Sequence, residues 1–231
     1  MTTMDSRSNP IEPALGQQPL WKRYVPGHHW RSADEEFDAC TLGFWLFLAT
    51  EVLLFAGLFC AYAVMRFKYP EAFLNGSQYL DWRWGTLNTV VLLISSYTMA
   101  ASIRMFQLDR QKAGRNLLLF TFLCGIAFLI IKFTFEYYPK AMQGKLPGQF
   151  FSYPFASDPM EPIWWSIYYS ATGIHALHVV IGMGLIAWCW FRAGKKAYGP
   201  THYTMVENTG LYWHLVDLIW IFLFPLLYLI H

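Results

Sequence analysis

WLFLATEVLLFAGLFCAYAVMR, from Trp45 to Arg66, is an apolar run in which Glu51 is the only charged residue before Arg66. At 1.5 Å per residue, about 20 helical residues cross the roughly 30 Å hydrocarbon core of a bilayer. The run is apolar on all faces, whereas a strand of a membrane barrel needs only about ten residues of alternating polarity. The segment is therefore predicted to be a transmembrane helix.

Five stretches of this kind follow one another along the chain. We place them at residues 41–67, 85–107, 115–138, 165–191 and 208–230. The composition agrees, because 55% hydrophobic residues, 14% charged residues and a positive mean hydropathy are unusual for a soluble domain. No repeat or long linker divides the stretches. The predicted fold class is all-α, a polytopic membrane protein with one bundle of five transmembrane helices over residues 41–231.

The first 40 residues and the loops between the spans predict the orientation. Residues 1–40 are polar and lack the short apolar core of a secretory signal, so they are expected to form a retained cytoplasmic tail. Five spans put the tail on the side of the second and fourth loops, with these cations: Arg7, Lys22, Arg23, Arg31, Arg104, Arg110, Lys112, Arg115, Arg192, Lys195 and Lys196. The other side holds only Arg66, Lys68, Arg83, Lys140 and Lys145. The positive-inside rule therefore predicts a cytoplasmic N-terminus and an external C-terminus.

Two classes of function are disfavoured by composition. A net charge of +2 without clustered cations on a polar surface gives no footprint for nucleic acid. The cysteines are widely separated, which argues against a disulfide framework or a paired-cysteine metal site. We interpret them as small buried apolar residues. They are Cys40, Cys60, Cys124 and Cys189.

Charged residues inside the spans carry the functional information, since an acid near the bilayer centre costs about 2.5–3.5 kcal/mol on insertion. Four are candidates for intramembrane polar or proton-related sites: Glu51, Lys132, Glu136 and Asp217. Lys132 and Glu136 are four residues apart and are expected to neutralise each other near the membrane edge, from which Lys132 can reach the interface. Glu51 has no such partner on its own helix. It is either a protonatable site, a permanently neutral acid or a hydrogen-bonded anchor between helices.

Three histidines also lie within the spans. His175 and His178 are three residues apart in the fourth span, and His214 precedes Asp217 by three residues in the fifth. A metal or haem site is one interpretation, but zinc sites on one helix use histidines four residues apart. We therefore favour polar packing between the fourth and fifth helices, or lipid contact. Neither a metal ligand nor a catalytic residue is predicted.

The spans together resemble subunit III of the haem-copper oxidases. Trp45–Arg66 resembles the signature helix of that family, with its acid in an aromatic-rich apolar helix. The family's later helices are similar, in the same order, to LNTVVLLISSYT (Leu87–Thr98), FLIIKFTFEYY (Phe128–Tyr138), YYSATGIHALHVVIG (Tyr168–Gly182) and YWHLVDLIWIFLFPLLYLI (Tyr212–Ile230). The resemblance extends from about Thr41 to the end of the chain. It is closest to the five-helix bacterial form, which lacks two helices of the longer form.

This resemblance implies a non-catalytic subunit of a cytochrome c oxidase in the bacterial plasma membrane. It implies packing against oxidase subunits I and II, support of proton uptake, contact with cytochrome c or quinol only through the complex, and room for bound phospholipid. Haem and copper are then expected in the partner subunits, and Glu51 corresponds to the family's carbodiimide-reactive carboxylate. Three alternatives stay open: a subunit III homologue of a quinol oxidase, an accessory protein of a nitric oxide reductase, and a stand-alone proton or solute transporter using Glu51 and Asp217.

Overall fold

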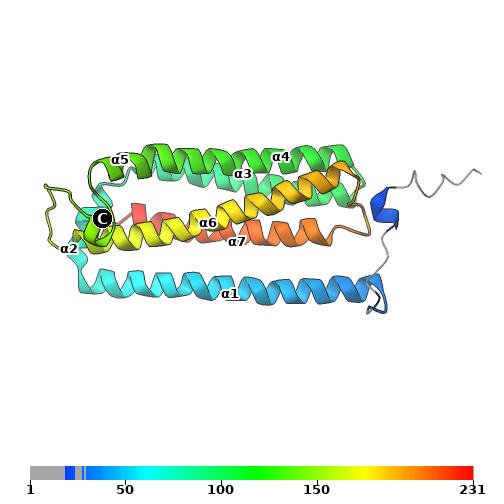
Figure 1. The fold of residues 1–231 in the computed structure, drawn as a ribbon, viewed down its shortest axis with the longest axis horizontal. Helices are drawn as coiled ribbons and strands as arrows, with labels where there is room; N and C mark the ends of the chain where they lie inside the picture. The colour runs from blue at the N-terminus through cyan, green and yellow to red at the C-terminus, as the bar shows by residue number, and fades with distance from the viewer. Residues whose placement is uncertain (1–18, 24–27, 29, 231) are drawn as a thin grey trace, which may run out of the picture.

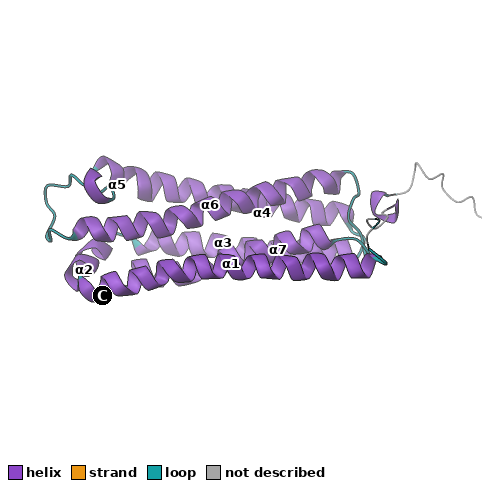
Figure 2. Cartoon of the chain, turned by 60° about the horizontal axis from the view of Figure 1, so that its bottom comes forward, coloured by secondary structure: helices purple, strands orange, loops and turns teal. Residues whose placement is uncertain are grey.

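Five long helices lie side by side in the computed structural model, which describes residues 19–23, 28 and 30–230 (Figure 1). They are α1 (Ala33–Lys68), α3 (Trp82–Gln107), α4 (Gln111–Ile131), α6 (Glu161–Gly194) and α7 (Thr204–Tyr228). All five, with α4 continuing to Met142, are long and apolar enough to cross a membrane. Figure 2 shows helices and loops but no strand in the part of the chain that is described. The predicted all-α bundle of five spans is confirmed.

Shorter elements decorate the two ends of the bundle. They are η2 (Leu20–Arg23), α2 (Pro70–Gln78), a π-helical segment η3 (Lys132–Tyr137), α5 (Tyr138–Met142) and η4 (Gly148–Phe150). The loops between α3 and α4 and between α6 and α7 lie at the end where α1 begins, while α2 and α5 lie at the other end (Figure 1). Which end faces the cytoplasm stays a prediction.

Helix α1 begins before the apolar run that predicted it. The hydroxyl of Ser32 accepts a hydrogen bond from the Glu35 N–H at 3.1 Å, and the Glu35 carboxylate accepts one from the Arg31 N–H at 2.8 Å. This pattern is a polar N-cap, and the acids of the first turn also oppose the helix dipole. Because this cap is made of polar residues, the apolar run alone could not predict where α1 begins. The predicted tail therefore ends in helix, while residues 1–18, 24–27 and 29 are outside the described part.

The third span changes its helical geometry near its end. Pro139 has no N–H to give to the carbonyl four residues before it, and the chain responds with the π-helical turn of η3. The N–H of Tyr138 accordingly reaches back to the carbonyl of Phe133. This wider turn directs Lys132 and Glu136 into the bundle, where both are buried.

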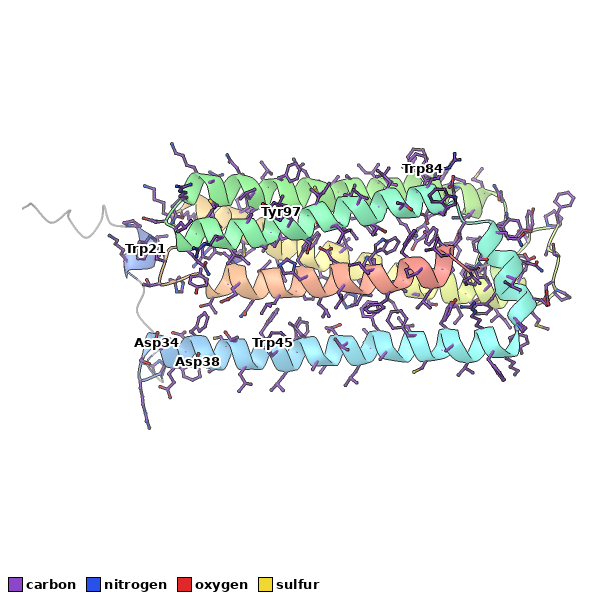
Figure 3. The ribbon with its side chains drawn as sticks, turned by 180° about the vertical axis from the view of Figure 1, so that it is seen from behind. Trp21, Asp34, Asp38, Trp45, Trp84 and Tyr97 are labelled. Atoms are coloured by element: carbon purple, nitrogen blue, oxygen red, sulfur yellow. The ribbon has the colours of Figure 1, made fainter. Side chains whose placement is uncertain are left out.

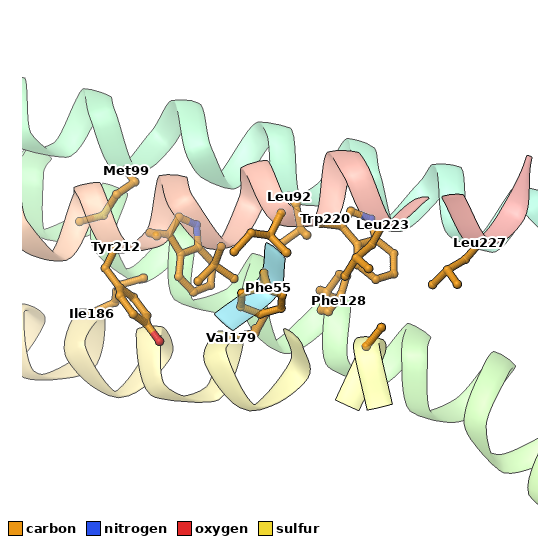
Figure 4. Packing of buried hydrophobic residues seen from close by; sticks show 14 of the residues in the cluster. Phe55, Leu92, Met99, Phe128, Val179, Ile186, Tyr212, Trp220, Leu223 and Leu227 are labelled. Carbon is orange, nitrogen blue, oxygen red and sulfur yellow. The ribbon is translucent and has the colours of Figure 1, made fainter. Parts of the chain in front are cut away.

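Helices α3, α4, α6 and α7 form the body of the bundle, and α1 lies along its outside (Figures 1 and 2). Large rings and hydroxyls join the helices: Trp213 and Trp220 of α7 donate to Ser95 Oγ at 2.9 Å and to Thr89 Oγ1 at 3.0 Å on α3. Lipid is as apolar as the core, so such hydrogen bonds and close packing, rather than hydrophobic burial, hold membrane helices together. Figure 4 shows the buried layer, with Phe55 of α1 reaching into it.

Contact between α1 and the body is narrow. Its buried side chains among those described are Leu48, Phe55 and Tyr62, which repeat every seven residues and form one strip. Tyr62 donates a hydrogen bond to the carbonyl of Leu226 at 2.5 Å. The other faces of α1 are open, and Cys60 is exposed there.

The cysteines are only partly as predicted. All four are free thiols, so no disulfide crosslinks the chain, as expected. The prediction of burial holds for Cys189, holds in part for the half-buried Cys124, and is wrong for Cys40 and Cys60, which are exposed. Both lie on α1 and face away from the buried strip that packs against the body of the bundle.

Candidate functional site

Glu51 of α1 is hydrogen-bonded to His178 of α6. The Glu51 carboxyl oxygen lies 2.8 Å from His178 Nε2, and His178 Nδ1 lies 2.7 Å from the Ile174 carbonyl oxygen. A carbonyl only accepts, so Nδ1 carries a hydrogen. Nε2 then either accepts a hydrogen bond from the neutral carboxyl of Glu51 or, in an imidazolium ring, donates one to the Glu51 carboxylate. In both states one proton lies between the two groups, and the pair has no net charge.

The Glu51–His178 pair sits where α1 meets the bundle. Phe55 packs edge-on against the His178 ring at a centroid distance of 5.0 Å, and the Tyr212 ring lies at 6.4 Å. The side chains of His178 and Glu51 are only 10% and 17% exposed. Of the three predicted roles for Glu51, the anchor between helices is therefore present in the structure.

A second polar cluster lies inside the bundle near the end marked by α2. Lys132 Nζ is 2.5 Å from Glu136 Oε2, 3.2 Å from the Tyr168 hydroxyl and 2.6 Å from the Tyr228 hydroxyl. Both tyrosines also donate to the same Glu136 oxygen. We call these four residues the Lys132 cluster. The predicted ion pair forms, but Lys132 does not extend toward the interface, because the wide turn of η3 points it inward.

Lys140 adds a second cation to this cluster. Its Nζ lies 3.9 Å from Glu136 Oε2, so one carboxylate faces two amines, and all three side chains are buried. Aromatic faces offset part of the excess positive charge: Lys132 lies 4.9 Å from the Trp220 ring, and Lys140 lies 5.3 Å from the Tyr168 ring. Glu136 is thus the central group of the cluster.

The remaining histidines and Asp217 lie in separate surroundings within the bundle. His214 Nδ1 lies 2.7 Å from Ser96 Oγ on α3. His175 and Asp217 are buried, and neither makes a hydrogen bond to a described residue. Of the packing predicted between the fourth and fifth helices, the His175 ring lies 5.1 Å from the Trp220 ring of α7, whereas the side-chain hydrogen bonds of His178 and His214 go to α1 and α3. Within the described residues, no three His, Cys, Asp or Glu side chains are grouped to hold a metal ion.

Four partners were not predicted from the sequence: Ser96, Tyr168, Tyr228 and Lys140. The first three lie 32 to 118 residues from the groups they contact, so no local pattern connects them. Lys140 lies four residues from Glu136, and the spacing that predicted the Lys132–Glu136 pair could have found it. For the two tyrosines, the sequence did offer one signal, which is the depth of each residue along its span. Tyr168 begins the fourth span and Tyr228 ends the fifth, which places both hydroxyls at the level of Lys132 near the end of the third.

Lys145, which lies outside the spans, connects the long loop before α6 to the end of α2. Lys145 Nζ lies 3.6 Å from the centre of the Tyr79 ring and 4.2 Å from that of Tyr153. Burial lowers the pKa of the Lys145 amine, and the nearby Glu161 carboxylate partly opposes this. The amine between two rings joins the loop to the segment after α2. The loop therefore covers the end of the bundle that contains the Lys132 cluster.

Comparison with known proteins points to one family. Residues 23–231 match the family model for cytochrome c oxidase subunit III. The cytochrome bo(3) ubiquinol oxidase subunit 3 of Pseudomonas putida is 31% identical, with 82% of this chain and 84% of the relative aligned. Cytochrome c oxidase subunit 3 of Thermostichus vulcanus is 30% identical over 86% of this chain and 90% of its own. That of Synechocystis is 31% identical over 96% and 88%.

Proposed function

The chain belongs to the cytochrome c oxidase subunit III family, and from this premise we propose that it is the non-catalytic third subunit of a respiratory haem-copper oxidase. Its partners are oxidase subunits I and II, which carry the haem and copper, and its location is the plasma membrane of a bacterium. The family match over residues 23–231 is the observation that carries this proposal. The predicted orientation, with a cytoplasmic N-terminus, completes it.

The ring nitrogens of two membrane histidines support a role without a redox centre. His178 uses both nitrogens, one on Glu51 and one on a backbone carbonyl. His214 uses Nδ1 on Ser96. Because both ring nitrogens of His178 are occupied, this histidine is poorly placed to bind a metal.

The open faces of α1 support a role in assembly. Leu53 and Phe67 are 71% and 91% exposed, and Leu46 is 64% exposed. Apolar side chains at this density need lipid or another protein to cover them. In the proposed complex, lipid and the partner subunits supply that cover.

Glu51 and His178 provide the proposed link to proton uptake. The pair holds one proton and is neutral, so it can pass that proton on without a residual charge if a second proton arrives as the first leaves. Its position beneath α1 makes it reachable from the membrane. Support of proton uptake in the complex is therefore assigned to this pair.

Labelling with a lipid-soluble carbodiimide tests the position of Glu51. The reagent needs a protonated carboxyl that it can reach from lipid, and Glu51 is partly exposed, whereas Asp217 is only 3% exposed. We expect one labelled carboxyl in the wild-type chain and none in Glu51→Gln, with Asp217→Asn labelled like the wild type. Mass spectrometry of the labelled peptides measures this. Persistent labelling of Glu51→Gln would assign the reaction to another acid.

Purification from the native membrane tests the function itself. We expect a tagged chain in mild detergent to bring down haem, seen in a reduced-minus-oxidised spectrum, together with oxygen uptake driven by cytochrome c. A colourless preparation of the intact chain, free of partners, would refute the proposal and favour a stand-alone transporter.

The names of the relatives differ in the electron donor. Their names include both cytochrome c and quinol oxidases. We propose cytochrome c as the donor, in line with the family's name. The same oxygen-uptake assay decides, because activity with quinol alone would identify a quinol oxidase instead.

A further inference from the structure

A hollow of about 550 Å³ opens at the end of the bundle where α3 turns into α4. Arg110, Lys112 and Lys196 line it, and Asp109 is the only acid among the described residues that line it. We call it the basic hollow. It lies at the end of five apolar spans, where lipid headgroups begin, and its lining comes from three separate segments of the chain.

The backbone holds two of these charged residues in an uncommon conformation. Asp109 and Lys196 have φ angles of 55° and 54°, and they are the only non-glycine residues with positive φ in the described part of the chain. Each follows the end of a helix, where a left-handed residue lets the next N–H reach the last carbonyls, as Arg110 does to Met105 at 2.8 Å. Glycine is favoured at such positions. A lysine there places a cation in the hollow that the turn itself does not need.

The three cations of the basic hollow are available to bind an anion, whereas its acid is already hydrogen-bonded. Asp109 accepts a hydrogen bond from the Gln111 side chain at 2.8 Å, and the same amide donates to the Tyr198 carbonyl at 2.6 Å. By contrast, Arg110, Lys112 and Lys196 form no ion pair with any described residue. Two net positive charges therefore face the hollow without a counter-ion in the described part of the chain.

Trp21 closes one side of the hollow. The Trp21 ring lies so close to Gly199 that a Cβ on Gly199 would be 2.4 Å from the ring. The backbone N–H of Trp21 donates to the Lys196 carbonyl at 3.4 Å. The indole N–H has no acceptor among the described residues. Figure 3 shows Trp21 beyond the helix ends, well away from the acids Asp34 and Asp38 at the start of α1. Tryptophan favours this headgroup level.

We propose that the basic hollow binds the phosphate of an anionic phospholipid headgroup. Three cations without an ion-pair partner among the described residues, together with the level of the site, suit a phosphate that belongs to a lipid. The first free N–H groups of α4, which begins at Gln111 without a side-chain cap, add to the same attraction. The occupant is a lipid because the acyl chains can lie along the exposed apolar faces of the adjoining spans.

The test compares two double variants with the same change in charge. Lys112→Gln/Lys196→Asn empties the hollow of two cations, and asparagine tolerates the left-handed turn. Arg104→Gln/Lys195→Gln removes two exposed cations at the same end that do not line the hollow. The full-length protein, with the subunits that accompany it, is titrated with phosphatidylglycerol or phosphatidylcholine and bound lipid is counted by native mass spectrometry.

We expect the hollow variant to bind phosphatidylglycerol about tenfold more weakly than the wild type, and the control variant to bind it like the wild type. Added salt should weaken the wild-type binding of phosphatidylglycerol and leave that of phosphatidylcholine unchanged. Equal losses in both variants would overturn the proposal in favour of diffuse surface charge. Displacement of the lipid by millimolar inorganic phosphate would overturn the choice of lipid and identify a site for free anions.

Discussion

Replacing Glu136 with glutamine is expected to lower the free energy of unfolding by about 3–5 kcal/mol. Glutamine keeps the size of the side chain but removes the negative charge that Lys132 and Lys140 share at 2.5 and 3.9 Å. Two amines would then remain buried with only hydroxyls and ring faces around them. Denaturant unfolding of the purified chain in detergent micelles, followed by tryptophan fluorescence, measures the loss.

The geometry also predicts an order among variants. Lys132→Met should cost less than Glu136→Gln, because Glu136 keeps Lys140 and the two tyrosine hydroxyls. Glu71→Gln, on the exposed face of α2, serves as the control and should change stability by no more than about 0.5 kcal/mol. If Lys132→Met were the more damaging change, Lys140 would not be sharing the carboxylate. The combined variant should lose less than the sum of the two single losses, because the residues are coupled.

The Lys132 cluster also shows how far sequence reasoning reaches. The spacing of Lys132 and Glu136 predicts their pairing, because both lie on one helix and four residues bring them together. It cannot supply Tyr168 or Tyr228, whose hydroxyls arrive from other helices once the bundle has packed. The pairing of Glu51 with His178 has the same origin, since 127 residues separate them. Sequence therefore indicates which buried charges need partners, and packing determines which partners they receive.

The positions of the helices can also be predicted only in part from the sequence. The five spans follow from apolar length alone, because crossing a bilayer is a requirement on length and polarity. The helix ends follow from local chemistry that apolar length does not register, such as the Ser32 cap of α1 and the effect of Pro139 on η3. Helix α2 was missed for the same reason, since it is short, polar in part and lies beyond the first span.

The second large loss of stability is expected from a substitution in α2. Gly76 of α2 faces Trp164 of α6, and a Cβ on Gly76 would lie 2.1 Å from the Trp164 ring. The ring cannot easily move, because Trp164 is fully buried and Phe73 packs against it at a centroid distance of 5.1 Å. Gly76→Ala is therefore expected to cost about 1–3 kcal/mol through overpacking, at the upper end of that range. The same unfolding measurement in detergent records it.

Gly57 supplies a matched control for this substitution, because it also lies in a helix but has open space where a Cβ would be. Gly57→Ala should be neutral or gain up to about 1 kcal/mol, since alanine favours the helix. A smaller side chain at position 164 should then relieve the clash, so Trp164→Leu should cost less in the Gly76→Ala background than in the wild type. Equal costs in the two backgrounds would show that α2 does not depend on this contact. Relief would establish that the close approach of Gly76 to Trp164 docks α2 on α6, and with it the loop between the first two spans.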